Sequence, residues 1–353
     1  MEIRNNISNF QRFQYGCYQF MDHFFGRPKA HKMTEGQRRK YYHRLLDSLK
    51  EKGEGKVIPL ERRKDLSLKE FKEQYLSKGK PVILEGAAKE WDCVKNWGLD
   101  YFKQLHGTDE IIVMDQKRME DPYERMTLAD IIDGIKEGKG KYYRFYPLLE
   151  KHPEHILDFD YKWLRERRNP LTAFEAFQVF IGGDGSLTPL HNANQCNLFT
   201  QVVGEKKWML YHPMHTAIID PEPVRNVYRS APCRKEGLPF DPFEPNYEAP
   251  YGLFKYIDSY SVHLKPGDVL WNPPFYWHAV KNVGDSIGVG YRWLPPLYCF
   301  KNSFLYSLLD LFAKNPPIWK SYKLYNQDIN LIHMAEYGQL EKYKLEELEK
   351  KGS

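Results

Sequence analysis

Many short apolar runs, each closed by glycine or proline, fill the chain from residue 141 to about residue 296 and constrain its fold most strongly. They include YYRFYPL, FQVFIGG, NLFTQVV, KKWMLYHP, SVHLKPGDVLWNPP and SIGVGYRWL. Short runs rich in aromatic and β-branched residues, separated by tight turns, are typical of a β-sandwich or β-barrel. The segment therefore predicts a mainly β domain, with one tight hairpin at Val203-Gly204-Glu205-Lys206.

Helical patterns precede this region. Thr34 and Gln37 form a capping-box pattern, after which Tyr41, Leu45 and Leu49 recur at helical spacing in a segment rich in Lys and Arg. We expect a helix with an apolar stripe toward the protein and a solvated basic face.

Further start and stop signals divide the chain before residue 141. Ser67 and Glu70 form a second capping box that opens a helix ending at Gly79, and MTLADIIDGIKEG predicts an amphipathic helix. PVILEG and EIIVMD predict short strands, and the chain returns to helix near its end. We therefore expect a helical N-terminal extension over residues 1–64, a β-rich domain over 65–296 and a helical C-terminal segment over 297–353.

Composition narrows the possible classes of protein. Hydrophobic residues make up 42% of the chain and charged residues 28%, which allows a packed core and argues against general disorder. The net charge of +5 is modest for 353 residues, so we do not expect nucleic acid as a partner. Five scattered cysteines without a CxxC pair indicate a reducing compartment. The N-terminus has no secretory h-region and no apolar stretch is long enough to span a bilayer, so we expect a cytoplasmic protein without membrane contact.

Two histidines occur in sequence contexts that suit a metal. His191 precedes a strand-like run, and His278 follows a strand and a Pro-Pro turn. Two neutral imidazoles from opposite strands of a small barrel can hold a divalent metal and leave several positions open, which is most of the geometry of a non-haem iron site. A single histidine among the 12 would more often be structural, so the hypothesis depends on both contexts together.

Three motifs follow one another in the order and spacing of a known family. They are Thr-Pro-x-His at 188–191, Gly-x-Lys at 204–206 and Gly-Asp-Val-Leu…Pro-Pro…Trp-His at 267–278, with PVILEGAAKEW and KYYRFY upstream. In this combination the chain resembles the jumonji-C or cupin-like family of iron(II)/2-oxoglutarate oxygenases, especially its asparaginyl-hydroxylase branch, from about residue 66 to 296. The resemblance implies a double-stranded β-helix of the jelly-roll, cupin-like type with helical additions at both ends. It also implies iron(II), 2-oxoglutarate and O2, with the metal near one mouth of the barrel.

The resemblance assigns roles to individual residues. His191 and His278 match the metal ligands. Lys206 matches the lysine that pairs with the distal carboxylate of 2-oxoglutarate, a role that suits the point charge of an ammonium group. Thr188 matches the hydroxyl that supports the same carboxylate, and Asn197 matches the amide at the metal-side end of the cosubstrate. A third distal contact is matched best by Tyr143, with Tyr142 and Tyr146 as alternatives.

One position departs sharply from the family pattern. Relatives carry His-x-Asp or His-x-Glu, whereas this chain has His191-Asn192-Ala193. Residues i and i+2 of a strand face the same side, so Ala193 stands where the third metal ligand is expected. A methyl group cannot bind a metal, and an anion could occupy the space that it leaves.

Three interpretations follow from Ala193. In the first, which we favour, chloride or bromide fills the position and the enzyme is a radical halogenase, since small residues there are the hallmark of iron/2-oxoglutarate halogenases. In the second, water or the amide of Asn192 or Asn194 completes the metal shell and the enzyme hydroxylates. In the third, the metal is lost and the fold serves as a binding protein, although the complete set of cosubstrate residues argues against that.

The sequence does not select a substrate, and an amino acid, a peptide or protein, and a small molecule all remain open. Gly290 replaces an amide found in close relatives, so either the site is roomier or Arg292 or Trp293 defines it. The aromatic segment 212–258 is expected to cover the site.

The apolar face of the C-terminal segment allows two interpretations. Phe300, Phe304, Leu308 and Phe312 recur at helical spacing. They suit either a homodimer through the C-terminal helices or packing against the chain's own barrel.

Overall fold

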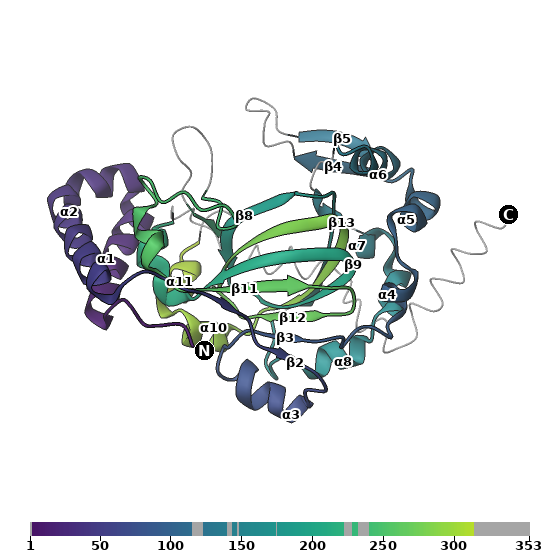
Figure 1. Ribbon diagram of the computed structural model, residues 1–353, viewed down its shortest axis with the longest axis horizontal. Helices are drawn as coiled ribbons and strands as arrows, with labels where there is room; N and C mark the ends of the chain where they lie inside the picture. Colours follow the sequence, from purple (N-terminus) through teal and green to yellow (C-terminus); the bar gives the residue numbers. More distant parts are fainter. Residues whose placement is uncertain are drawn as a thin grey trace.

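The computed structural model describes residues 2–114, 123–139, 143–146, 148–173, 175–221, 228–231 and 240–313. Figure 1 shows a central barrel of strands, with two long N-terminal helices on one side and a smaller helical lobe with a two-stranded ribbon on the other. The predicted mainly β core with helices at both ends is confirmed.

Six strands make most of the barrel, and two of them serve both of its faces. They are β7 (Glu175–Gly182), β8 (Leu187–Ala193), β9 (Cys196–Tyr211), β11 (Ser259–Leu264), β12 (Val269–Asn272) and β13 (Trp277–Trp293). One face pairs β7, β13, β9 and β12, and the other pairs β8, β13, β9 and β11, all antiparallel. The long strands β9 and β13 pair from end to end, so they hold both faces in one continuous structure.

The hairpin predicted at Gly204 is wrong, because β9 continues through that position. β13 pairs with Val203 before the glycine and with Lys206 after it, with a shift of register between the two. Gly204 has a φ of 63°, and a Cβ there would lie 2.0 Å from the carbonyl oxygen of Asp285. The glycine therefore forms a bend within one strand, where a bulge in β13 takes up the extra residues.

Helices α1 (Asn9–Phe25) and α2 (Arg27–Lys52) pack against each other beside the barrel (Figure 1). The helix start predicted at Thr34 is wrong, because α2 begins seven residues earlier, after a glycine and with proline in its first turn. Thr34 Oγ1 instead donates to the carbonyl oxygen of Ala30 inside the helix, at 2.7 Å. The apolar stripe of this basic helix is confirmed. Its buried positions include Tyr41, Leu45 and Leu49.

The remaining elements are short. Before the barrel they are β1 (Val57–Pro59), β2 (Arg62–Arg63), α3 (Leu68–Glu70), which continues as a π-helical turn (Phe71–Leu76), and β3 (Val82–Leu84). The lobe contains α4 (Asp92–Asn96), α5 (Leu99–His106), β4 (Glu110–Met114), β5 (Tyr123–Thr127), α6 (Leu128–Lys136), β6 (Tyr143–Tyr146), α7 (Leu148–Lys151), the 3-10 helix η2 (Pro153–Asp158) and α8 (Tyr161–Glu166). After β9 follow η3 (Pro213–His215), α9 (Thr216–Ile219), β10 (Tyr228–Ser230), η4 (Gly252–Tyr256), α10 (Pro296–Asn302) and α11 (Phe304–Leu311). The capping box at Ser67 and the predicted strands β3 and β4 and helix α6 are confirmed.

Aromatic side chains fill the barrel and also anchor the elements outside it. Phe180, Phe199 and Trp208 belong to one buried cluster on the inner side of the strands. Trp271 and Trp293 stack with centroids 5.5 Å apart in a second cluster, which includes residues of the lobe helices. Burying one phenylalanine side chain stabilises a fold by about 1.5–3 kcal/mol, so these clusters fix the strands firmly around the inner space.

Helices α10 and α11 lie near α1 at one end of the barrel. Phe312 contacts Phe24 of α1 with ring centroids 5.4 Å apart, yet it is 46% exposed, and Phe304 is 67% exposed. Part of the predicted apolar face thus packs against the chain itself, and a homodimer through the rest of it stays a prediction. Residues after 313 lie outside the described ranges.

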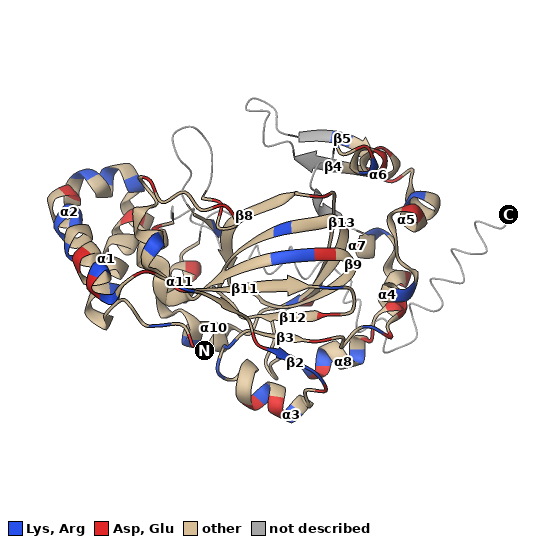
Figure 2. Cartoon of the chain, in the orientation of Figure 1, with Lys and Arg blue, Asp and Glu red and all other residues tan. Residues whose placement is uncertain are grey.

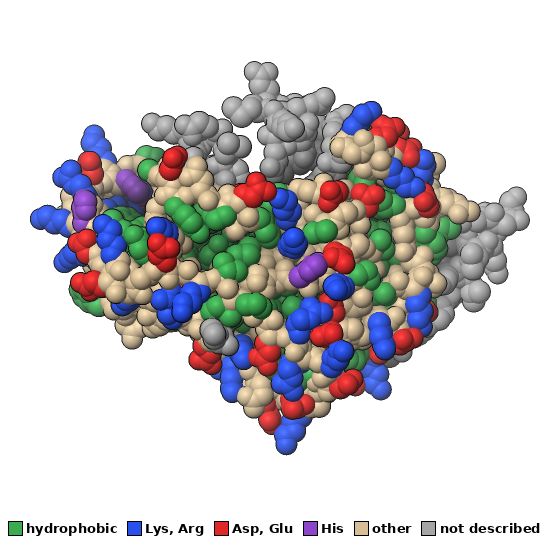
Figure 3. Space-filling model, in the orientation of Figure 1, with side chains coloured by type: hydrophobic (Ala, Val, Ile, Leu, Met, Phe, Trp, Pro, Cys, Tyr) green, Lys and Arg blue, Asp and Glu red, His purple; other side chains and the backbone are tan. Residues whose placement is uncertain are grey.

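Charged and apolar side chains are distributed unevenly over the protein. Charged side chains lie mainly on the outer helices, and the barrel strands are largely neutral apart from charged stretches on β9 and β13 (Figure 2). Hydrophobic side chains gather between the N-terminal helices and the barrel on the face drawn in Figure 3. Within the described part of the chain, no helix combines the length and the apolar character needed to cross a membrane.

Candidate metal and cosubstrate site

His191 on β8 and His278 on β13 lie side by side. The two residues are direct partners in the antiparallel register, and their ring centroids are 4.1 Å apart. Both side chains are buried. Directly opposite residues of antiparallel strands project from the same face, so the two imidazoles share one space.

The same local device orients both rings. His191 Nδ1 donates to the carbonyl oxygen of Pro189 at 2.7 Å, and His278 Nδ1 donates to that of Tyr276 at 2.9 Å. A carbonyl oxygen can only accept, so each Nδ1 carries the proton and each Nε2 of the neutral ring carries a lone pair. Imidazoles held in one tautomer by a backbone carbonyl are typical of metal ligands. The pair therefore suits iron(II), which accepts imidazole nitrogen and leaves positions open for other ligands.

An aromatic wall adjoins the histidines. The ring of Trp208 stacks on His278 with centroids 5.5 Å apart, and Phe199 packs edge-on against Trp208 at 4.8 Å. Such a wall excludes water and strengthens the electrostatic interactions beside it. Sequence reasoning missed Trp208, although the alternation of side chains along β9 places it on the same face as Lys206.

Lys206 carries its ammonium group into the interior of the barrel. The residue is 1% exposed, and its Nζ donates to Asn282 Oδ1 at 2.5 Å. Burial lowers the pKa of Lys206 to about 7. A dianionic ligand beside the ammonium group would favour the charged form and offset the cost of burial. Asn282, which sequence reasoning missed, is the direct partner of Lys206 in the register of β9 and β13.

Two of the side chains that the resemblance assigns to the cosubstrate are buried and have polar atoms without a hydrogen-bond partner among the described residues. They are Thr188, through its Oγ1, and Asn197, through both atoms of its amide. Leaving such a group unsatisfied costs about 1–3 kcal/mol, so buried groups of this kind are normally satisfied by protein, water or ligand. Thr188 on β8 pairs with Val280 of β13, two residues after His278. Asn197 is the second residue of β9. The donor set therefore fits a polar cosubstrate such as 2-oxoglutarate.

The two expectations for Gly290, a roomier site or a site defined by Arg292 or Trp293, stay predictions. A Cβ at this position would lie 2.9 Å from Asn197 Oδ1, so the asparagine side chain already takes the adjacent space. Trp293 belongs to the second buried cluster, where it stacks on Trp271. Arg292 pairs directly with Asn197 and shares its face of the strands.

Ala193 stands two residues after His191 on β8, as the sequence indicates. Whether water or the amide of Asn192 or Asn194 takes the place of the missing ligand stays a prediction. Asn192 Nδ2 donates to a backbone carbonyl of the turn before β13 at 3.4 Å, and Asn194 Nδ2 donates to Asp310 Oδ2 at 3.1 Å. Asn192 Oδ1 is buried without a hydrogen-bond partner among the described residues. Alternate residues of a strand face opposite sides, so Asn192 projects away from the side of β8 that carries His191 and Ala193.

Tyr143 and Tyr146 lie on β6, where their backbones pair with Ile181 and Val179 of β7. The side chains of both tyrosines, and the whole of Tyr142, lie outside the described residues. The tyrosine contact to the cosubstrate therefore stays a prediction.

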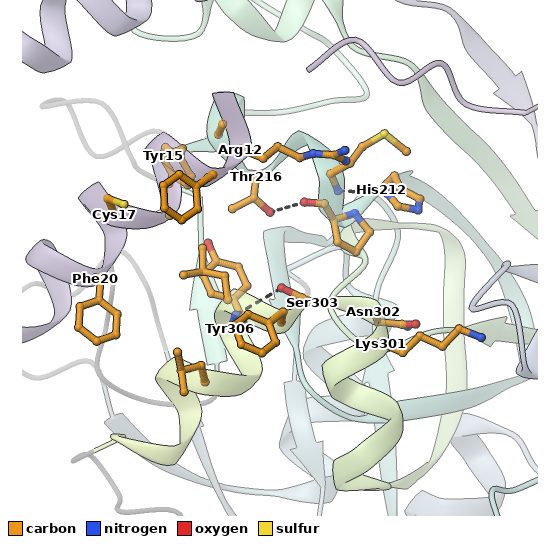
Figure 4. Close-up of a pocket in the computed structure, with 18 of the residues that line it drawn as sticks. Arg12, Tyr15, Cys17, Phe20, His212, Thr216, Lys301, Asn302, Ser303 and Tyr306 are labelled. Carbon is orange, nitrogen blue, oxygen red and sulfur yellow. Dashed lines mark hydrogen bonds between the residues drawn. The ribbon is translucent and has the colours of Figure 1, made fainter. Parts of the chain in front are cut away.

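An apolar pocket of about 850 Å³ lies outside the barrel, between α1, α11 and the turn after β9 (Figure 4). Tyr15, His212, Thr216 and Tyr306 are among the residues that line it. Neither barrel histidine does. The start of the segment 212–258 thus lines this outer pocket, and its predicted role as a cover of the metal site stays a prediction.

The barrel and its paired histidines together define the class of protein. A two-faced antiparallel barrel with two inward histidines on neighbouring strands is the arrangement expected of a cupin-like protein. The family model described as "Cupin-like domain" matches residues 68–297, and the chain belongs to this family. The predicted cupin-like fold class is thereby confirmed.

Several curated proteins are similar to this chain. Lysine-specific demethylase 8 of Xenopus tropicalis is 27% identical over 236 residues, which cover 64% of this chain and 51% of the demethylase. Arginine-specific demethylase JMJ20 of Arabidopsis thaliana is 23% identical over 303 residues, covering 74% of this chain and 59% of the relative. The human bifunctional peptidase and (3S)-lysyl hydroxylase JMJD7 is 22% identical over 276 residues, covering 69% and 86%.

The chain spans little more than half the length of the frog demethylase and of JMJ20. Similarity to JmjC proteins implies iron(II) and 2-oxoglutarate as cofactor and cosubstrate. The names of these relatives describe demethylation and hydroxylation, so they give no support to the halogenase interpretation. The expected likeness to the asparaginyl-hydroxylase branch stays a prediction.

Proposed function

We propose that this protein is an iron(II)/2-oxoglutarate-dependent oxygenase that hydroxylates a C–H bond of its substrate. The observation that carries the proposal is the pair of buried imidazoles, direct partners in the strand register, each with its Nδ1 proton held by a backbone carbonyl. This arrangement prepares both Nε2 atoms to bind one metal before the metal arrives.

The other side chains of the site have separate tasks. Lys206 attracts the distal carboxylate of 2-oxoglutarate, and Thr188 donates its hydroxyl to the same group. Asn197 binds the keto-acid end. Trp208 and Phe199 keep water away from the reacting groups. Bound iron(II) and 2-oxoglutarate together supply the activation of O2 that the side chains themselves cannot provide.

Water is the ligand that we propose for the position beside Ala193, because Asn192 projects from the opposite side of β8 and Asn194 donates to Asp310. Halogenation is the second candidate, and the specific observation in its favour is the methyl group of Ala193 itself. A chloride ion in that place would be transferred to the substrate instead of oxygen. The third candidate, a binding protein without turnover, is disfavoured by the energetic cost of keeping Lys206 buried.

The names of the relatives suggest which substrates to test first. Two of them specify lysine or arginine demethylation and one specifies lysyl hydroxylation. We therefore propose peptides that contain lysine and arginine as the first substrate class, followed by free amino acids.

The decisive experiment follows 2-oxoglutarate turnover and product mass together. Purified protein is incubated with iron(II), 2-oxoglutarate and a peptide library, with and without chloride, and succinate is measured. Hydroxylation predicts a product that gains one oxygen atom whether or not chloride is present, whereas halogenation predicts a chlorinated product only with chloride. Succinate that never forms, with any peptide or without one, would leave only the binding-protein candidate.

Ala193→Asp sharpens this test, because it restores a carboxylate two residues after His191. We expect at least tenfold tighter iron(II) binding and faster formation of the hydroxylated product. Ala193→Asn, which has the same shape without the charge, is the matched control and should give less of both effects. A chlorinated product of the wild type that disappears in Ala193→Asp would instead establish halogenation.

A further inference from the structure

Three potential metal ligands meet in the lobe, away from the barrel histidines. His106 is the last residue of α5. His152 directly follows α7, and Glu154 is the second residue of η2. One ligand atom from each of the three lies within 4.8 Å of the other two. The rings of His106 and His152 stack with centroids 3.5 Å apart and planes inclined by 20°. Figure 1 shows α5 and α7 on the side of the barrel opposite α1 and α2.

Hydrogen bonds behind the two stacked rings fix their tautomers. His152 Nε2 lies 2.9 Å from Asp109 Oδ2, and a carboxylate only accepts, so Nε2 carries the proton and Nδ1 the lone pair. His106 Nε2 lies 2.9 Å from His155 Nε2, while His155 Nδ1 donates to Asp158 Oδ2 at 3.0 Å. His155 in its neutral form must then accept at Nε2, so His106 donates from Nε2 and keeps its lone pair on Nδ1. Carboxylates that orient imidazoles in this way are typical of the second shell of metal sites.

Glu154 supplies an independent indication of a ligand. The residue is 8% exposed, and its Oε2 is buried without a hydrogen-bond partner among the described residues. Its Oε1 lies 3.9 Å from His152 Nδ1, the atom that carries the lone pair. A buried carboxylate oxygen without a donor is costly, and a cation bound by the carboxylate and by the Nδ1 atoms at the edges of the two rings would remove that cost.

We infer that His106, His152 and Glu154 form a second metal site that binds a divalent transition metal of the zinc type. Two imidazole nitrogens and one carboxylate oxygen suit zinc, which takes a fourth ligand such as water in sites of this composition. His152 has a side chain that is 16% exposed, which gives the ion a route from solvent. The bound metal would tie the end of α5 to the segment that leads from α7 into η2, and would thereby stiffen the lobe.

Metal content and thermal stability of the full-length chain test this inference without any turnover. The variant His191→Ala/His278→Ala removes the barrel ligands, so zinc that it still retains after desalting reports the lobe site. We expect one zinc per chain in this variant and a higher Tm with zinc than with a chelator. Adding Glu154→Gln, which keeps the shape of the side chain, should weaken zinc binding at least tenfold and remove the increase in Tm.

His263→Gln is the matched control, because His263 forms an exposed pair with Glu205 that has no place in either cluster. It should leave the zinc content of the background variant unchanged. Asp109→Asn tests the tautomer argument and should weaken binding by about 10–100-fold, since it disturbs a group behind a ligand.

If the double variant folds poorly, zinc content is measured in protein that keeps both barrel histidines. There, Glu154→Gln should lower the zinc content by one equivalent per chain. Zinc content that is the same with and without Glu154→Gln in both backgrounds would overturn the inference. The readout is independent of 2-oxoglutarate turnover, so failure of the proposed enzymatic function would not affect it.

Discussion

At the scale of single residues, burial in the barrel changes the pKa of Lys206. In the unfolded chain its pKa lies near the ordinary value of 10.5, and burial lowers the pKa in the folded protein to about 7. Below pH 7 the ammonium is charged in both states, and the folded protein bears the full cost of its burial. Between pH 7 and about 10.5 the folded state binds fewer protons than the unfolded state, so this residue makes stability rise with pH.

Binding of 2-oxoglutarate should show the opposite dependence on pH. The dicarboxylate prefers the charged ammonium, so above pH 7 binding must take up a proton and affinity should fall roughly tenfold per pH unit. Calorimetric titration at several pH values, in buffers of different ionisation enthalpy, measures both the affinity and the proton uptake. Lys206→Arg keeps a permanent charge, so the affinity that it retains should not depend on pH in this range. A flat profile for the wild type would contradict the assignment of Lys206.

At the scale of elements, a glycine of β13 makes room for side chains of its neighbour β9. A Cβ at Gly288 would lie 2.3 Å from Phe199 Cζ and 3.1 Å from Lys206 Cε. Phe199 and Lys206 can occupy their positions only because the neighbouring strand carries no side chain at position 288.

Gly288→Ala should therefore damage the site and the fold together. We expect the free energy of unfolding to fall by about 1–3 kcal/mol, because the added methyl group overpacks the inner cluster, and 2-oxoglutarate affinity to fall with it. Denaturant unfolding and ligand titration measure the two effects. Gly134→Ala, in helix α6 with no atom within 4 Å of the new Cβ, is the matched control and should be neutral or slightly stabilising. Equal stability of the two variants would show that Phe199 and Lys206 can move aside for the added methyl group.

Some of these elements and site residues could be predicted from the sequence, and others could not. The short apolar runs and the tight turns between them predict the strands, and the two motif histidines indicate a shared site. The Gly204 bend was missed because a glycine before a charged pair has the same local pattern in a hairpin and in a bulged strand. The His106 cluster carries no local signal, since its members come from separate elements that only tertiary packing brings together. The orientation of Asn192 and Asn194 likewise depends on distant partners.

At the scale of the whole molecule, the C-terminal helices are tied to the strand that carries Ala193. Arg229 Nη2 donates to Asp310 Oδ1 at 2.6 Å, and Asn194 Nδ2 donates to the other oxygen of the same carboxylate. Both charged residues are almost completely buried. Helix α11 is thereby hydrogen-bonded, through Asp310, to the turn between β8 and β9.

Asp310→Ala should destabilise the protein by about 3–5 kcal/mol, because it leaves the Arg229 guanidinium buried without its carboxylate. Chemical unfolding measures this loss. Lys281→Ala removes an exposed ion pair with Glu244 and is the control, with an expected effect of about 0–1 kcal/mol. Similar values for the two variants would mean that the buried pair contributes no more than a surface one.

The end-to-end pairing of β9 with β13 also bears on how the protein reaches its native state. Because each of these strands belongs to both faces, neither face has a complete set of neighbours until the other has formed. Contacts between residues so far apart in sequence carry a large loop-closure cost and slow the search for the native topology. We therefore expect the barrel to appear in one late, cooperative step, with the two imidazoles brought together only as the final strand is placed.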